Sequence, residues 1–249
     1  MKIKSNYIKP EFKKESNPNV GLLALSTDLT IERDFQSICH SLPINLFVNR
    51  IHNENPLTKE NLLKMYDQLE SITEKILPGE KINTVAYGCT SGTIAIGEDK
   101  VKEKIQLAKP GCQVTTPITS AIKAFNKMNI KKIAVFTPYP ESVNKTISEY
   151  FIKKNITVMS FSTFNLDLDV DFARVDPKYL FEILTKLNIN DADALFVSCT
   201  ALPALEIIDK VEKKIYKPVF SSNQTLIWDT IRSVGYKSSV EGYGKLLRI

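Results

Sequence analysis

Short apolar runs and amphipathic stretches alternate along the chain. Runs of strand length cover residues 20–25, 44–48 and 84–87, and helical patterns cover 30–40 and 58–77 between them. Thr58 is expected to cap the longer helix. Strands that alternate with helices favour an α/β fold, in which parallel sheets are covered by helices on both faces.

The second half of the chain repeats this layout. Strands are predicted at 132–136, 156–160 and 194–197, and helices at 141–154 and 177–187. The two series are displaced by 110 to 113 residues. This displacement favours two pseudo-symmetric units of similar size.

A Cys-Thr pair follows a predicted buried strand in each half, at Cys89-Thr90 and Cys199-Thr200. Ligands of parallel sheets bind beyond the carboxyl ends of the strands, so both thiols are expected in one site between facing halves. We expect a helix after each cysteine, whose N-terminus favours the thiolate. One buried cysteine is more often structural. The recurrence of the Cys-Thr pair at matched positions favours a catalytic role for both cysteines.

Two thiols that face one carbon atom from opposite sides can carry out racemisation or isomerisation without a cofactor. The remaining cysteines, Cys39 and Cys112, lack this context and are interpreted as structural. With only His40 and His52 available, and no cysteine pair of zinc type, no metal site is predicted.

Other polar residues stand at equivalent strand ends. Asp28 ends the first strand, and its charge suits a cationic nitrogen on the substrate better than a dianion. The Tyr139 hydroxyl is a donor for a carboxylate or an intermediate. The candidate substrate-binding residues are Ser26, Asp28, Thr90, Ser91, Tyr139, Thr200 and Asn223.

Composition excludes several classes of protein. The net charge of +5 comes from dispersed lysines without a basic block, which argues against nucleic-acid binding. No apolar run approaches the ~20 residues of a membrane span, and the start lacks a secretory signal. A cytoplasmic protein is expected, with a small anionic or zwitterionic substrate and a possible homo-oligomeric state.

Several ordered motifs carry a family resemblance. They begin at Gly21 (GLLALSTD), Tyr87 (YGCTSG), Thr137 (TPY), Ser198 (SCTALP) and Lys217 (KPVFSSNQ). Together they resemble the Asp/Glu/hydantoin racemase superfamily, in the branch of maleate cis-trans isomerase, arylmalonate decarboxylase and the ectoine-utilisation racemase-like protein. The resemblance implies two flavodoxin-like lobes, a C-terminal helix that crosses back to the first lobe, and a cofactor-free site with a cysteine pair in the cleft.

The lobes are expected to comprise residues 19–116 with 222–249, and residues 117–221, after a lead-in at 1–18. The leading hypothesis is a racemase or isomerase that transfers protons between Cys89 and Cys199, acting on a small amino acid, an N-substituted amino acid or a dicarboxylate. Three alternatives remain open: a maleate cis-trans isomerase that works by thiolate addition, a decarboxylase of the arylmalonate type, and a non-catalytic binding protein.

The resemblance also bears on the alternatives. The decarboxylase type keeps only the second cysteine, so Cys89 argues against decarboxylation. The maleate isomerase type has Asn where this chain has Asp28, which argues against maleate because an ionised Asp cannot donate to a carboxylate. The run from Ser26 to Phe35 looks most like the ectoine-utilisation type.

Overall fold

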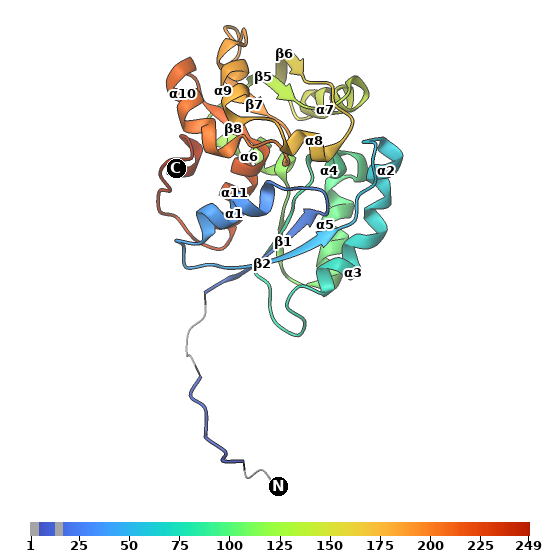
Figure 1. Cartoon of the computed structure of the whole chain (residues 1–249), viewed down its shortest axis with the longest axis vertical. Helices are drawn as coiled ribbons and strands as arrows, with labels where there is room; N and C mark the ends of the chain where they lie inside the picture. Colours follow the sequence, from blue (N-terminus) through green and yellow to red (C-terminus); the bar gives the residue numbers. More distant parts are fainter. Residues whose placement is uncertain (1–4, 13–16) are drawn as a thin grey trace.

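The computed structural model describes residues 5–12 and 17–249, and residues 5–12 are exposed and extend away from the body of the protein (Figure 1). The expected lead-in at 1–18 lies partly outside the described residues. Two four-stranded parallel sheets form the body, with the strand orders β2-β1-β3-β4 and β6-β5-β7-β8. The strands are β1 (Asn19–Leu25), β2 (Asn45–Ile51), β3 (Thr84–Tyr87), β4 (Gln113–Thr115), β5 (Lys132–Thr137), β6 (Thr157–Thr163), β7 (Ala194–Val197) and β8 (Val219–Ser221).

The two strand orders become identical when four is added to each strand number of the first sheet. The α/β class and the two pseudo-symmetric lobes are therefore confirmed. The central strands β1, β3, β5 and β7 are the most buried because helices cover both faces. The helices are α1 (Ile31–Cys39), α2 (Lys59–Lys64), α3 (Leu69–Glu74), α4 (Thr90–Ile96), α5 (Glu98–Ala108), α6 (Pro117–Lys127), α7 (Glu141–Lys153), α8 (Asp169–Ala173), α9 (Pro177–Lys186), α10 (Ile208–Ile215) and α11 (Ser222–Ser233), with 3-10 turns at Tyr66–Gln68, Leu205–Ile207 and Leu246–Arg248.

The helix that follows the last strand of each sheet packs against the other half of the chain. Helix α6 follows β4, yet its Phe125 ring meets Phe196 of β7 and Phe220 of β8 edge-on, with centroids 5.6 and 5.1 Å apart. Aromatic pairs at these distances and angles are favourable. This crossing fixes one lobe against the other.

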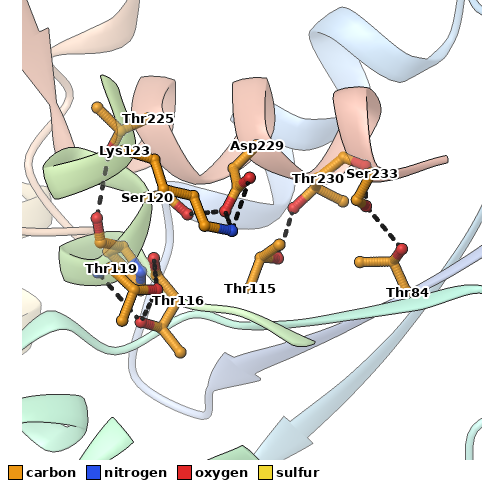
Figure 2. A network of polar contacts seen from close by, with 11 residues as sticks. Thr84, Thr115, Thr116, Thr119, Ser120, Lys123, Thr225, Asp229, Thr230 and Ser233 are labelled. Atoms are coloured by element: carbon orange, nitrogen blue, oxygen red, sulfur yellow. Dashed lines mark hydrogen bonds and ion pairs between the residues drawn. The ribbon is translucent and has the colours of Figure 1, made fainter. Parts of the chain in front are cut away.

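Helix α11 makes the reciprocal crossing from β8 back to the first sheet, as the resemblance implied. Its Thr230 hydroxyl lies 2.8 Å from the Thr115 hydroxyl of β4, and its Ser233 hydroxyl lies 2.7 Å from that of Thr84 in β3 (Figure 2). This exchange supports the expected lobe boundaries, which we keep as a proposal.

Helices α6 and α11 also bind each other through polar side chains. The Asp229 carboxylate accepts from the Ser120 hydroxyl at 2.9 Å and from the Lys123 ammonium at 2.7 Å (Figure 2). The two crossing helices are therefore joined by polar contacts as well as by apolar packing.

Two local expectations need correction. The helix expected over 58–77 is interrupted by the 3-10 turn Tyr66–Gln68 and ends at Glu74, although Thr58 caps it as predicted. A helix follows Cys89 at once, but residues 200–204 are non-helical and α10 begins only at Ile208. In the part of the chain that the structure describes, no helix is long and apolar enough to cross a membrane.

Candidate active site

Cys89 lies at the junction between β3 and α4. Strand β3 is fully buried, and Gly88 then leads the chain to Cys89, which takes the N-cap position of α4. The Gly92 amide donates to Sγ of Cys89 at 3.2 Å. The Ser91 hydroxyl lies 3.9 Å from the same sulfur atom. The start of α4 therefore holds the thiol in place.

Cys199 takes the equivalent place after β7 in the second half. It is buried, as is Tyr139, whose hydroxyl is a neighbour that lowers the pKa of the Cys199 thiol. Tyr139 follows β5 and packs edge-on against Phe172 of α8, with centroids 5.6 Å apart. This contact fixes the position of the ring.

The two cysteines lie at one site, because the hydroxyl of Thr200, next to Cys199, donates to the carbonyl of Gly88, next to Cys89, at 3.3 Å. The pKa of Tyr139 is raised well above its usual value by burial, and the charges of Cys199 and Cys89 both contribute. The charge of Asp169 likewise raises the pKa of both cysteines. The structure thus brings together Cys89, Cys199 and Tyr139, three residues that are far apart in the sequence.

Burial dominates the ionisation of both thiols. It raises the pKa of Cys89 to about 12, although the Gly92 amide opposes the shift. Burial also raises the pKa of Cys199 above the usual range, against the effect of the Tyr139 hydroxyl. The expectation that a helix N-terminus favours the thiolate is therefore wrong for the free protein, since desolvation outweighs the amide.

Asp28 is buried beside this pair, with 1% of its surface exposed. Its Oδ1 accepts from the amides of Thr30 and Ile31 at 2.7 and 2.9 Å, which starts α1. Its Oδ2 is buried and has no hydrogen-bond partner among the described residues. Burial raises the pKa of Asp28, against the hydrogen bonds from these two amides.

Asp169 is a site residue that the sequence analysis missed. It is the first residue of α8, in the second half, but its Oδ2 accepts from Asn53 at 2.6 Å and from the Thr27 hydroxyl at 3.2 Å in the first half. Burial raises its pKa to about 6, and the charge of Asp28 adds to the shift. Asp169 therefore bridges the lobes next to the thiols.

Asn223 connects the start of α11 to the same region. Its Nδ2 donates to Oδ2 of Asp34 at 2.8 Å and to the carbonyl of Thr200 at 2.7 Å, whereas its buried Oδ1 has no partner among the described residues. Burial raises the pKa of Asp34 to about 7. Asp34 is a second acid that the sequence analysis missed, since it lies in the middle of a helical pattern.

Two further predicted residues, Thr90 and Thr200, are buried next to the cysteines. The Thr90 hydroxyl is 2.9 Å from that of Ser222, and the Thr200 hydroxyl donates to the Gly88 carbonyl at 3.3 Å. Ser26 is exposed; its hydroxyl donates to the Ile51 carbonyl at 3.0 Å and to Oδ1 of Asn53 at 3.4 Å, so Asn53 connects it to Asp169.

Ser91 also lines a cavity of about 610 Å³ between α2, α4 and α7. Leu62, Ile94 and Ile147 contribute apolar surface, and Lys59 and Glu149 contribute charge. The cysteines do not line it. Because Ser91 contacts both the cavity and Sγ of Cys89, the cavity adjoins the thiol site.

Comparisons with known proteins show a family and a set of similar folds for this chain. The family described as arylmalonate decarboxylase matches residues 95–247. The chain is 25% identical over 244 residues to a maleate isomerase of Geobacillus stearothermophilus, covering 92% of this chain and 96% of the relative. The maleate isomerase Iso of Pseudomonas putida S16 has the same fold, with a TM-score of 0.85, 21% identity, and coverage of 93% and 98% of the two chains.

A further solved structure is a Cys-to-Ser variant of the maleate cis-trans isomerase of Nocardia farcinica, with a covalently bound succinylcysteine intermediate. It matches with a TM-score of 0.85 and 18% identity, over 93% of this chain and 98% of that one. An arylmalonate decarboxylase structure matches with a TM-score of 0.72 and 20% identity, over 92% and 99%.

Proposed function

The chain belongs to the arylmalonate decarboxylase family, and from this premise we propose that it is a cofactor-independent isomerase in which Cys89 and Cys199 transfer a proton between two faces of a small carboxylate substrate. The observation that carries the proposal is the pair of buried thiols at pseudo-equivalent strand ends, which share Tyr139 and Asp169 as neighbours. A pair of structural cysteines does not require this shared environment.

In the proposed reaction one cysteine enters as a thiolate and the other as a thiol. The thiolate takes the proton from the α-carbon, and its electron pair forms the S–H bond while the C–H pair moves into an enolate. The opposite thiol then gives its proton to the other face and becomes the thiolate. The Gly92 amide and the Ser91 hydroxyl beside Cys89, and the Tyr139 hydroxyl beside Cys199, are donors that stabilise charge as it moves.

Because the pKa values of both thiols are raised, turnover requires that one thiol first be converted to a thiolate. With a pKa of about 12 for Cys89, forming the thiolate at neutral pH costs on the order of 7 kcal/mol. One thiol must therefore lose its proton to solvent, with help from charges that the substrate brings. The pH–rate profile is expected to rise toward alkaline pH.

A second function, cis-trans isomerisation of a double bond, is favoured by the similarity to the Nocardia farcinica enzyme with its succinylcysteine intermediate. In that case the thiolate adds to one alkene carbon, a proton adds to the other, the new single bond rotates, and elimination restores thiolate and alkene. Both reactions use the same two cysteines. They differ in whether the substrate carries an α-proton or a double bond.

Proton NMR in deuterated water tests the proposal, with aspartate, glutamate, their N-acetyl derivatives and maleate as substrates. We expect loss of an α-proton signal from at least one amino-acid member. Cys89→Ser and Cys199→Ser should each abolish this exchange. The matched controls are Cys39→Ser and Cys112→Ser, which change buried free cysteines outside the site and should keep the exchange.

Full activity in either Cys89→Ser or Cys199→Ser would contradict the two-thiol mechanism. Conversion of maleate to fumarate without α-proton exchange would favour the second function. Release of carbon dioxide from an arylmalonate that survives Cys89→Ala would favour the decarboxylase, because that reaction needs a single thiol.

A further inference from the structure

The thiol pair lies in a strongly acidic environment. Asp28 and Asp169 are 1% and 5% exposed, and the charges of both raise the pKa of Cys199. The cation that acts on Asp28 is Arg50, whose guanidinium donates to the carbonyls of Leu25 and Asp28 at 3.0 and 2.8 Å. Its second terminal nitrogen forms an ion pair with Glu32 at 2.7 Å, so both terminal nitrogens of Arg50 already have partners.

One carboxylate oxygen of Asp28 and one of Asp169 accept no hydrogen bond from the described residues. Oδ2 of Asp28 is buried and has no partner within the described part of the chain. Both protein contacts of Asp169, from Asn53 and Thr27, go to Oδ2, which leaves Oδ1 available to a ligand. A buried carboxylate oxygen without a donor is costly, because it has lost its water and gained nothing in return. Oδ2 of Asp28 therefore calls for a donor from a ligand.

We propose that Asp28 and Asp169 bind the ammonium group of an amino-acid substrate, beside the carbon that loses its proton. An ammonium carries three donors and a positive charge, so it can satisfy an oxygen of each aspartate and leave one donor over. The inference deepens the proposed function and rests on it for the identity of the reacting carbon.

Charge balance supports this class of substrate over a dianion. A substrate with two carboxylates adds two negative charges to a buried site that already holds two aspartates and must form a thiolate, and unpaired buried charges are expensive. An ammonium offsets one of these charges. It also acidifies the adjacent C–H bond, which helps a thiolate to remove the proton.

Binding measurements separate the ammonium site from catalysis. Isothermal titration calorimetry compares three pairs in which a methyl group replaces the ammonium: aspartate with methylsuccinate, glutamate with 2-methylglutarate, and alanine with isobutyrate. In at least one pair the amino acid should bind about 10- to 100-fold more tightly, since a hydrogen bond to a charged group contributes about 1.5–3 kcal/mol. Equal or no binding within all three pairs overturns the proposal.

Two variants connect this preference to the named residues. Asp28→Asn keeps Oδ1 as the acceptor for Thr30 and Ile31, and Asp169→Asn keeps one carbonyl oxygen for its partners. Each should reduce the preference for the amino acid to less than about 3-fold, by removing the negative charge. The matched control is Asp229→Asn, a buried acid paired with Lys123 at the lobe interface, which should retain the full preference. An unchanged preference in both site variants overturns the assignment.

The α-proton exchange experiment distinguishes a failure of the ammonium site from a failure of the proposed function. If α-proton exchange occurs equally well with free and N-acetylated amino acids, the proposed function stands and the ammonium site is wrong. If no substrate exchanges but the binding preference is present and depends on Asp28, the ammonium site stands and the proposed function is wrong.

Discussion

Gly92 offers the sharpest test of where the Cys89 thiol lies. A Cβ atom at this position would lie 2.7 Å from Sγ of Cys89, 2.7 Å from the Tyr87 hydroxyl oxygen and 2.8 Å from the terminal methyl group of Met65. Ordinary contacts between such atoms are about 3.5–4.0 Å. In Gly92→Ala the sulfur, the hydroxyl and the methyl group must therefore together yield by about 1 Å.

The expected loss of activity exceeds the expected loss of stability. Overpacking costs about 1–3 kcal/mol, and the better helix propensity of Ala returns about 0.5–1 kcal/mol in α4, so the net destabilisation is roughly 0–2 kcal/mol. A displacement of 1 Å at a reacting group can cost about 100-fold in rate. We expect kcat for α-proton exchange or for maleate isomerisation to fall by that factor, with a nearly normal urea unfolding curve.

Gly79→Ala is the matched control. Gly79 has a φ of +82°, and no atom of the described residues lies within 4 Å of the Cβ that Ala would add, so Ala is strained there by about 1–2 kcal/mol without touching the site. It should lose stability and keep full activity. Wild-type turnover in Gly92→Ala would show that Sγ of Cys89 does not occupy the reacting position.

Three further predictions concern the fold. Acidification from about pH 7.5 to 5.5 should raise the free energy of unfolding by roughly 2 kcal/mol. The pKa values of Asp34 (about 7) and Asp169 (about 6) are raised in the folded protein, so over this range the folded chain binds protons and the unfolded chain does not. The cost of burying these two carboxylates in ionised form is present above their folded pKa values and is lost as the pH falls below them. Urea midpoints measured against pH test this, and Asp169→Asn should reduce the slope. Asp229→Ala should cost about 1–3 kcal/mol in urea unfolding, since it leaves the buried Ser120 hydroxyl without its acceptor. Phe125→Ala should cost about 3–5 kcal/mol in the same assay, and a loss below 1 kcal/mol would contradict the interlobe packing of this ring.

The sequence was informative wherever local pattern decides structure. The apolar runs that form β3 and β7 are fully buried strands, and the Cys-Thr pair that follows each of them predicts both thiols at equivalent strand ends. The same symmetry places Asp28 and Tyr139 after β1 and β5. These positions were predictable because the end of a parallel strand is a fixed location in an α/β fold.

The sequence was uninformative where distant segments meet. Asp169 stands in a run of alternating apolar and acidic residues (166–172), a pattern typical of a strand and not of the helix start that it forms, and its contacts with Asn53 and Thr27 come from more than 100 residues earlier. The pKa of Cys89 was misjudged for the same reason. The helix N-terminus is visible in the sequence, whereas the burial that outweighs it is a property of the assembled lobes.

The two halves of the site match in the position of the thiols and differ in the residues that follow β1 and β5. Cys89 and Cys199 occupy equivalent strand ends, but the position after β1 carries an acid, Asp28, where the position after β5 leads to a phenol, Tyr139. Proton transfer to either face of one carbon needs two equivalent bases, because the reaction runs in both directions. A substrate held between equivalent anchors would have no fixed orientation, however, so its two ends must meet different groups. Asp28 would pair with a cationic nitrogen at one end of such a substrate, and the neutral Tyr139 hydroxyl would donate to a carboxylate at the other end. Under the proposed function, unlike groups beside like thiols therefore suit an amino acid, whose two ends differ, better than a symmetric dianion.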